Sequence, residues 1–295
     1  MTRFRRVRDG LAPAALERCR ARPAGIAGLR AASDGELAAA HAEGMVRIPG
    51  GGEPVSPSLL DVKIELARRA LADCRLCPHE CGVNRLTGEV GFCGVGAEAH
   101  VAAQMVHLGE QADLVPAYSV FLAGCTMRCL YCRRPDLLAR PQEGESLGPD
   151  AFAASVRAGV EEGARTLKLL GGTPEPGVHA ILRGLRALDV SLPVMWESTM
   201  FMASQCLQII RGTIDLFIAN LRYGNDDCAR ELAGVESYLE PALGALREVS
   251  EWAVVTLRHL VLPGHIDCCT APLAEMLEEA LPEAELVLLM QYVPF

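Results

Sequence analysis

Short apolar runs alternate with amphipathic stretches from residue 118 to the end of the chain. The runs long enough for buried strands cover 118–123, 166–170, 193–197, 215–219, 254–262 and 285–291. Apolar residues at helical spacing predict helices over 149–162, 178–188, 201–211, 226–232, 235–250 and 272–280. Strands buried on both faces lack polar–apolar alternation, which is typical of parallel sheets covered by helices. The pattern therefore predicts an α/β fold, either an open doubly wound sheet or a partial (β/α)6 barrel of the TIM type.

The first 117 residues follow a different pattern. A Gly/Pro cluster at 49–54 cannot continue a helix, an amphipathic helix is predicted at 58–72, and residues 73–97 carry four cysteines and five glycines. We therefore expect three parts: an N-terminal extension and linker (1–57), a helix with a cysteine-rich module (58–117) and a core (118–295). Residues 1–50 have nine Arg against five acidic residues, so we expect a helical extension exposed to solvent, with a docking arm for an acidic partner as the alternative.

Charge and composition exclude several classes of protein. The net charge of −9 and the pI of about 5.4 argue against a nucleic-acid binder, which needs surplus Lys and Arg. No run approaches the ~18 consecutive apolar residues of a membrane span, and no apolar segment typical of a secretory signal follows the basic N-terminus. The twelve cysteines are clustered like metal ligands rather than spread as a disulfide framework, so we expect a reducing, cytoplasmic location.

A cysteine triplet directly follows the first predicted core strand. Cys125, Cys129 and Cys132 form a C-x3-C-x2-C motif at the carboxyl end of that strand, where parallel α/β folds carry their functional loops. A [4Fe–4S] cluster normally takes four cysteines, and neither a fourth cysteine nor a histidine occurs between residues 108 and 137. The triplet therefore predicts a cluster with one open iron. A non-catalytic metalloprotein with structural zinc or electron-carrying clusters is the alternative.

This triplet, with an aromatic residue before its last cysteine, resembles the radical S-adenosylmethionine (SAM) superfamily. The resemblance implies that Cys125, Cys129 and Cys132 hold the cluster and that SAM chelates its open iron. It further implies that an electron cleaves SAM to a 5′-deoxyadenosyl radical. The backbone at Tyr131 would then lie near the adenine, and simple packing is the alternative for its side chain.

Two glycines follow the second predicted core strand. Gly171-Gly172-Thr173 resembles the Gly-Gly-Glu motif of the superfamily, whose backbone groups bind the methionyl ammonium of SAM. Thr173 replaces the acidic residue of that motif, so the resemblance implies cofactor contacts by Gly171 and Gly172 more than by Thr173. An ordinary strand-to-helix turn is the alternative.

Further segments narrow the resemblance to uncharacterised radical enzymes similar to pyruvate formate-lyase activating enzyme. These segments are 74–85, 91–93, 196–198, 222–226 and 262–270. The resemblance implies that the radical abstracts a hydrogen atom from a substrate, in a glycyl-radical protein or in another protein, peptide or metabolite. We expect an electron donor such as a flavodoxin or ferredoxin. Arg133-Arg134 stand where that family's pattern has Gln-Asn, so analogy does not give the substrate.

A second set of four cysteines lies earlier in the chain. Cys74, Cys77, Cys81 and Cys93, which we call the Cys74 group, have the spacing C-x2-C-x3-C-x11-C. This set suits either a structural zinc ion or an auxiliary iron–sulfur cluster, and its spacing does not choose between them. Four buried cysteines without a metal are the third possibility. His79 lies between these ligands and is expected to face solvent.

Several other polar residues and cysteines are expected near the carboxyl ends of the strands. The strand-end residues predicted to point into the barrel mouth are Glu197, Asn220, Arg222 and His265. Cys228, Cys268 and Cys269 are expected on the same rim, as packing residues, substrate thiols or a further ligand set. Lys168 is predicted inside a strand, where a buried lysine needs a carboxylate partner, and either Arg258 or His259 should face the barrel interior.

Overall fold

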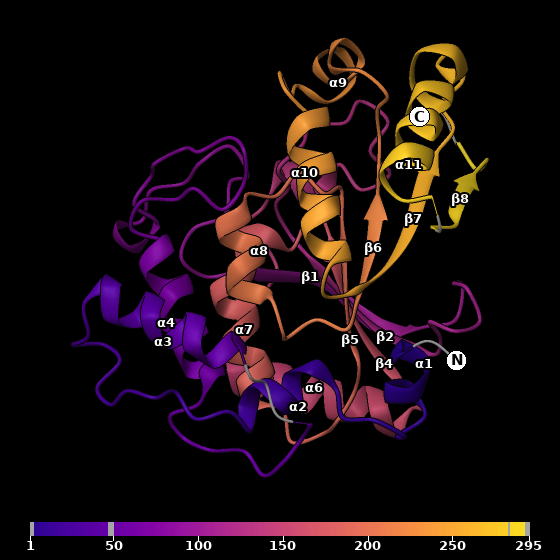
Figure 1. Ribbon diagram of the computed structural model, residues 1–295. Coiled ribbons are helices and arrows are strands. Elements are labelled where there is room, and N and C mark those ends of the chain that lie inside the picture. The colour runs from indigo at the N-terminus through magenta and orange to yellow at the C-terminus, as the bar shows by residue number, and fades with distance from the viewer. Residues whose placement is uncertain (1–2, 47–49, 283, 293–295) are drawn as a thin grey trace.

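The core of the protein is an open, twisted sheet covered by helices (Figure 1). The structure is a computed structural model that describes residues 3–46, 50–282 and 284–292. Its eight strands follow the order β3-β1-β2-β4-β5-β6-β7-β8. Each of the six predicted apolar runs coincides with one parallel strand. These strands are β2 (Ala117–Leu122), β4 (Thr166–Gly171), β5 (Val194–Ser198), β6 (Leu216–Asn220), β7 (Val254–Leu260) and β8 (Leu286–Leu289).

The predicted helices connect these strands as crossovers, so the α/β fold class is confirmed. They are α6 (Pro149–Glu161), α7 (Val178–Ala187), α8 (Ser204–Ile210), α9 (Asp226–Ala233), α10 (Leu239–Ser250) and α11 (Ala271–Ala280). Helix α7 shows why such segments fold this way: its apolar side chains recur at helical spacing, and Val178, Ile181 and Leu185 are fully buried. Figure 1 shows α9 and α11 at the end of the sheet toward which β6 and β7 point, and α1 (Arg3–Arg8) at the opposite end.

A buried ionic network shows that the sheet curls into a partial barrel. Lys168 on β4 and Arg258 on β7 both bind Glu110, although two strands separate β4 from β7 in the sheet. The Lys168 Nζ also lies 3.1 Å from Glu197 Oε2, and Asn220 donates to Glu197 Oε1 at 3.0 Å. Burial opposes ionisation of Glu110, but the two cations outweigh it and lower the pKa of this carboxyl group. The expectation that the buried Lys168 needs a carboxylate partner is therefore confirmed, because it binds both Glu110 and Glu197.

Two antiparallel strands at the edge of the sheet were not predicted. Strand β1 (His100–His107) pairs with β2 and with the two-residue strand β3 (Glu145–Ser146). Most of the side chains of β1 are at least partly exposed, so no apolar run marks the strand in the sequence. Two short helical turns, η1 (Arg85–Thr87) and η2 (Glu175–Gly177), and helix α5 (Asp136–Ala139) complete the connections near the cysteine motifs.

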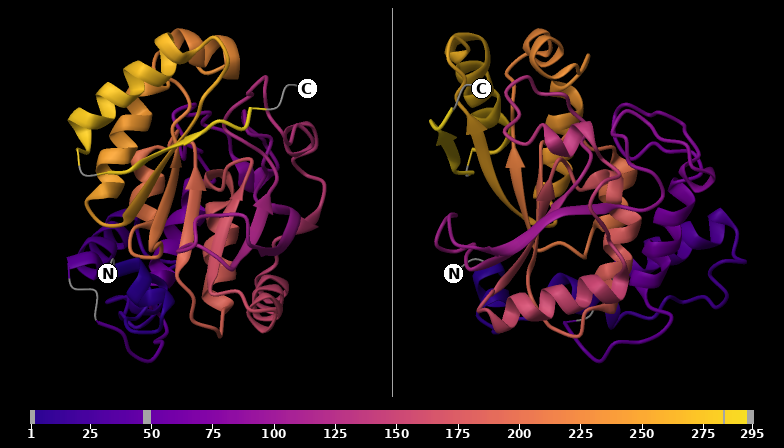
Figure 2. Two further views of the ribbon diagram at one scale, coloured as in Figure 1. Left: turned by 90° about the vertical axis from the view of Figure 1, so that its right-hand side faces the viewer. Right: turned by 180° about the vertical axis from the view of Figure 1, so that it is seen from behind.

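The N-terminal extension is helical and most of its described residues are at least partly exposed, as expected, but its apolar side chains pack against the core. It contains α1, α2 (Ala15–Arg20) and α3 (Asp34–Val46), which precede the predicted helix α4 (Leu59–Ala70). Phe4 of α1 is buried in a small apolar cluster with Leu114, Met195 and Leu216, at the amino-terminal end of the strands. Burial of these apolar side chains stabilises the packing of the segment against the core, although the segment carries a net positive charge. Figure 2 shows α3 and α4 along one side of the molecule, where α4 contacts α7 and α8.

Candidate active site

The loop that carries the cysteine triplet follows the carboxyl end of β2 and is hydrogen-bonded to the end of helix α9. Cys125 is buried, whereas Cys129 and Cys132 are partly exposed. The backbone N–H groups of Arg128 and Leu130 donate to the last carbonyls of α9, at 2.9 and 2.8 Å. The loop is therefore fixed by the helix that follows β6, not only by its own sequence.

The triplet lines a cavity of about 230 Å³ together with residues from four other strand ends. Its lining includes Cys125, Met127, Cys129, Tyr131, Cys132, Arg133, Arg134, Leu137, Leu138, Gly171, Gly172, Thr199, Arg222 and Leu260. All three cysteines, Tyr131 and the glycine pair thus face one cavity, at the end of a parallel sheet where ligands bind. Thr173 is not among the lining residues.

The glycine pair is required by the close approach of β4 to the cysteine loop. A Cβ atom on Gly172 would lie 1.7 Å from the Gly124 carbonyl oxygen and 3.0 Å from Cys125 Cβ. Gly171 has φ +129°, a backbone conformation that residues with a side chain rarely adopt. The N–H groups of Gly172 and Thr173 donate to Leu122 and Gly124 carbonyls, at 2.9 and 3.1 Å. An ammonium group at this cradle would therefore be bound by carbonyl oxygens.

Thr173 lies behind the cavity and supports the cysteine loop. Its hydroxyl accepts a hydrogen bond from the N–H of Thr126 at 3.2 Å, and its side chain is buried. An acidic residue does occur two positions later, where Glu175 is fully buried and bound to the Ser198 hydroxyl. Burial raises the pKa of Glu175, so this carboxyl group ionises less readily than an exposed one.

Two tyrosines connect the cysteine loop to the end of β6. The hydroxyl of Tyr131 donates to the Tyr223 hydroxyl at 2.7 Å, and the Tyr223 hydroxyl donates to Cys129 Sγ at 3.7 Å. Burial raises the pKa of both phenols, so both stay protonated and act as donors. Arg222, the one predicted strand-end residue that lines the cavity, adds a positive charge beside Cys129.

The other predicted strand-end residues lie elsewhere. Glu197 and Asn220 belong to the ionic network below the cavity, while His265 contacts Cys228 and Cys268 on the neighbouring loops. The sequence did not point to Thr199: it lines the cavity, and its buried hydroxyl has no hydrogen-bond partner among the residues that the structure describes. Its position directly after β5 is the only sequence signal that points to it.

The Cys74 group lies in a module that docks on the cysteine loop. His79 does not face solvent as expected: it is partly buried, its Nε2 lies 2.8 Å from the Thr126 carbonyl oxygen, and its ring stacks on Phe92 at 3.9 Å. The Arg128 guanidinium also lies over the Phe92 ring, 4.3 Å from its centre. The module therefore contacts the loop between the first two cysteines of the triplet.

Within this module, polar groups and a tight turn contact individual thiols of the Cys74 group. Arg85 donates to Cys93 Sγ at 3.3 Å, and the Phe92 N–H donates to Cys81 Sγ at 3.5 Å. A Cβ atom on Gly91 would lie 2.7 Å from Cys81 Sγ, so only glycine allows this turn. Burial, and then the neighbouring thiols, raise the pKa of Cys77 to about 12. Burial likewise raises the pKa of Cys125 to about 12, so both thiols ionise only when a cation is bound.

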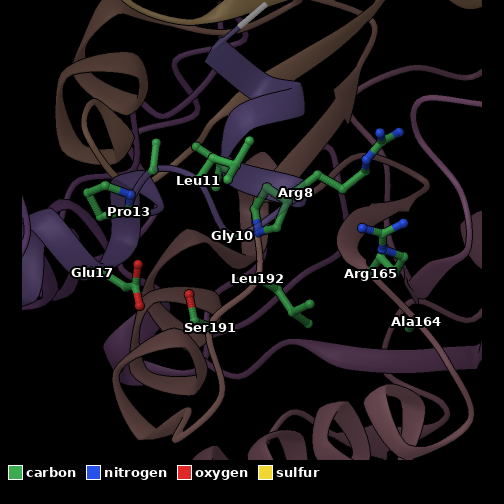
Figure 3. Close-up of a pocket in the computed structure, with 12 residues that line it drawn as sticks. Arg8, Gly10, Leu11, Pro13, Glu17, Ala164, Arg165, Ser191 and Leu192 are labelled. Atoms are coloured by element: carbon green, nitrogen blue, oxygen red, sulfur yellow. The ribbon is translucent and has the colours of Figure 1, made fainter.

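A second cavity lies at the opposite end of the sheet (Figure 3). It has a volume of about 560 Å³ and lies between the segment that follows α1 and the loops that enter β4 and β5. Arg8, Glu17 and Arg165 are its charged lining residues. Open parallel sheets bind ligands at the carboxyl ends of their strands, whereas this cavity lies at the amino-terminal ends. We therefore do not assign the active site to it.

Two comparisons relate large parts of the chain to known proteins. The family model of the Radical SAM superfamily matches residues 119–277. The uncharacterised protein MJ0674 of Methanocaldococcus jannaschii is 31% identical over 248 residues, which cover 82% of this chain and 72% of the relative.

Solved structures of Streptococcus suis SuiB resemble part of the chain. The structure bound to the precursor peptide SuiA has a TM-score of 0.41 and 13% identity, over 53% of this chain and 35% of SuiB. The structure bound to SAM has a TM-score of 0.41 and 11% identity, over 58% and 37% of the two chains. The chain thus corresponds to little more than a third of SuiB. Among the helices in the described part of the chain, none is long and apolar enough to cross a membrane.

Proposed function

We propose that this chain, which belongs to the radical SAM superfamily, is an enzyme that abstracts a hydrogen atom from its substrate with the help of SAM. The cluster and SAM together supply a 5′-deoxyadenosyl radical when both are bound. The observation that carries the proposal is one cavity lined by three cysteines and two glycines that tolerate no side chain. We assign the [4Fe–4S] cluster to Cys125, Cys129 and Cys132, and SAM to the remaining space.

The lining residues fit a zwitterionic, partly polar ligand. Carbonyl oxygens at Gly171 and Gly172 suit an ammonium group, because the N–H groups of Gly172 and Thr173 are already bonded. The unpartnered Thr199 hydroxyl is a buried polar atom in need of a hydrogen bond, which a ribose or carboxylate oxygen can provide. Arg222 suits a carboxylate beside the cluster ligands. We propose that Tyr131 contacts the cofactor and that Thr173 acts only by supporting the loop.

The tyrosine pair and the arginines at the cavity have separate roles in this proposal. Tyr131 and Tyr223 hold a chain of hydrogen bonds that ends on Cys129 Sγ and shields this thiolate from water. Arg133 and Arg134 line the cavity wall after the last cysteine. Arg134 is paired with the Asp136 carboxylate at 2.8 Å, so Arg133 is the cation left to favour a substrate that carries negative charge near the atom that reacts.

The finer assignment to enzymes similar to pyruvate formate-lyase activating enzyme is part of this proposal. It is supported by the Cys74 group and by the segments at 196–198, 222–226 and 262–270, which surround the cavity or its rim. We propose a protein or peptide substrate and a flavodoxin or ferredoxin as the electron donor. The two arginines at 133 and 134 distinguish this chain from the family pattern, so its substrate need not be a glycyl-radical protein.

We infer that the Cys74 group holds an auxiliary iron–sulfur cluster rather than a single zinc ion. Ligands of one metal ion lie close together, whereas thiolates that bind separate irons of a cluster are further apart. Among the residues that the structure describes, a different set is the one whose ligand atoms all lie within 4.8 Å of one another. The Cys74 group does not meet this limit, which supports a polynuclear centre over a single ion.

The test is reductive cleavage of SAM by anaerobically reconstituted protein. With a strong reductant and SAM, we expect 5′-deoxyadenosine and methionine, and the electron paramagnetic resonance spectrum of the reduced cluster should change on addition of SAM. The variant with Cys125, Cys129 and Cys132 all replaced by alanine should lack this product and lose the iron of one cluster. A protein that keeps this cluster but shows neither SAM-dependent spectral change nor 5′-deoxyadenosine is a non-catalytic metalloprotein.

A further inference from the structure

Four potential metal ligands meet on the rim of the barrel, outside the cavity described above. Cys228, His265, Cys268 and Cys269, which we call the Cys228 group, place one ligand atom each within 4.8 Å of one another. Cys228 belongs to the first turn of α9, after β6, and the other three residues lie between β7 and α11. The group therefore joins two loops whose ligands are at least 37 positions apart in the sequence, at the end of the sheet where α9 and α11 lie in Figure 1.

The distances within this group match one tetrahedral metal ion. Cys228 Sγ lies 3.7 Å from Cys268 Sγ, and His265 Nδ1 lies 3.6 and 3.3 Å from these two sulfurs. A zinc ion with Zn–S bonds of about 2.3 Å and a Zn–N bond of about 2.0 Å requires sulfur–sulfur separations of about 3.8 Å and sulfur–nitrogen separations of about 3.5 Å. Three apices of the required tetrahedron are thus in place, and the fourth ligand atom, from Cys269, lies within 4.8 Å of them.

The two adjacent cysteines lie at a local change of helix type. Helix α11 that follows is a regular α-helix. The segment Ile266–Thr270 is instead a π-helical turn, in which the N–H of Thr270 donates to the His265 carbonyl at 3.2 Å. Such wide turns are rare and are frequently found at functional sites.

The surrounding residues support the ligands as outer-shell residues of metal sites do. The Asn225 side chain accepts from the Cys228 N–H at 2.7 Å, and its Nδ2 lies 3.3 Å from Cys228 Sγ and 3.9 Å from Cys269 Sγ. The same Nδ2 donates to the Cys268 carbonyl at 2.5 Å. One amide therefore fixes three of the four ligands, and hydrogen bonds of this kind orient ligands and hold sulfur charge.

The backbone closes tightly around the group on the side of the cysteine loop. A Cβ atom on Gly224 would lie 2.3 Å from the Cys269 carbonyl oxygen, so only glycine allows the two loops to touch. The preceding residue, Tyr223, contacts Cys129. Cys228 and Cys269 are buried, while His265 and Cys268 are partly exposed, which leaves a path by which an ion can enter.

We propose that Cys228, His265, Cys268 and Cys269 bind one zinc ion, which ties the loop after β6 to the loop after β7. Three thiolates and one imidazole form a closed, four-coordinate set that is typical of structural rather than catalytic zinc. Because Tyr223 and Gly224 link this group to the cysteine triplet, the ion holds one wall of the active-site cavity in place. The ligands of this ion are distinct from the proposed ligands of the cluster and of SAM.

Cobalt(II) is the probe that tests the site in the full-length protein. Protein first reconstituted with iron, so that the other two cysteine sets are filled, and then titrated anaerobically with Co²⁺ should show the intense visible and near-ultraviolet bands of a tetrahedral ion with three thiolate ligands, and Zn²⁺ should displace it. In Cys228→Ala these bands and one equivalent of zinc should be lost, while the iron bound after reconstitution stays unchanged. The matched control is Cys206→Ala, a buried cysteine outside every ligand set, which should retain both metals.

A second variant keeps the test valid if Cys228→Ala does not fold. His265→Cys preserves four ligands, so it should still bind one Co²⁺ per site but shift the thiolate bands toward those of a four-cysteine site. Unchanged cobalt spectra in both variants would overturn the proposal. Zinc content equal to that of the wild type in folded Cys228→Ala, or a Cys228–Cys268 disulfide in protein purified anaerobically, would overturn it as well.

Discussion

The Tyr223 hydroxyl donates a hydrogen bond to the Sγ of Cys129 across 3.7 Å. Tyr223 itself accepts from Tyr131, so two hydroxyls are aligned on one proposed cluster ligand. A hydrogen bond to a cluster sulfur stabilises the reduced, more negative state and raises the reduction potential. Cys129 and Tyr223 are 94 positions apart in the sequence, and the curl of the sheet brings them together.

This contact predicts the effect of Tyr223→Phe. Loss of one hydrogen bond worth ~1 kcal/mol should lower the potential of the cluster by about 40 mV. Redox titration followed by electron paramagnetic resonance measures this shift, and the iron content should stay at the wild-type value. Tyr131→Phe, which removes only the second hydroxyl, should shift the potential less. Equal potentials in wild type and Tyr223→Phe would show that this hydroxyl does not tune the cluster.

Thr199 should contribute to the affinity for SAM. Thr199→Val keeps the shape of the side chain but removes the unpartnered hydroxyl, so the Kd for SAM should rise about 2- to 10-fold, the value of one neutral hydrogen bond. Equilibrium binding to the reconstituted protein measures this change. Thr199→Ser restores the hydroxyl and should restore affinity. An unchanged Kd in Thr199→Val would remove Thr199 from the proposed site.

The glycine at 172 should be needed for the cluster as well as for SAM. In Gly172→Ala the new methyl group collides with the backbone of Gly124, directly before Cys125, so the cysteine loop must move. We expect this variant to bind less iron after reconstitution and to lose SAM cleavage. Gly244→Ala is the control, because nothing lies within 4 Å of a Cβ at this position in α10, and it should reconstitute normally. Full iron content in Gly172→Ala would contradict this explanation.

The Cys74 group should hold its module together. A short glycine-rich segment has few apolar contacts of its own, so Cys74→Ala/Cys77→Ala should lose the iron of one cluster and expose residues 73–97 to protease. Limited proteolysis with mass spectrometry locates the cleavage, and iron analysis counts the loss. Cleavage resistance equal to that of the wild type, with reduced iron, would mean that the metal has no structural role.

The contact between α3 and α4 predicts a pH dependence of stability. His41 Nε2 accepts from Lys63 Nζ at 2.6 Å, and burial followed by the charge of Lys63 lowers the pKa of His41 from 6.5 to about 3. In the unfolded chain His41 has its ordinary pKa of 6.5. Between pH 6.5 and about 3, the unfolded chain therefore binds a proton at His41 that the folded chain does not bind. The contribution of His41 is therefore complete above pH 6.5 and is lost as the pH falls toward 3.

His41→Gln tests this dependence, since glutamine keeps an acceptor for Lys63 but does not titrate. Between pH 6 and pH 4 the free energy of unfolding of the wild type should fall more steeply than that of the variant, by up to about 1.4 kcal/mol per pH unit. Urea unfolding at each pH measures both slopes. Parallel curves would show that His41 is not held neutral in the folded protein.

The sequence by itself determined the parallel core and the cysteine triplet. Apolar runs buried on both faces mark the six parallel strands, because such strands need no polar side chains. The cysteines of the triplet lie within eight residues, so chain connectivity alone keeps them together. Cys74, Cys77 and Cys81 also lie within eight residues, so the same argument applies to them.

Tertiary structure decided the features that depend on pairs of distant segments. Strand β1, next to the edge strand β3, has mostly exposed or partly exposed side chains and therefore no apolar run, and Phe4 is buried although charged residues surround it in the sequence. Thr199 faces the cavity, Thr173 lies behind it, and His265 turns from the barrel mouth to Cys228. Side-chain direction at a strand end depends on the twist of the sheet and on a π-helical turn, and neither follows from residue spacing.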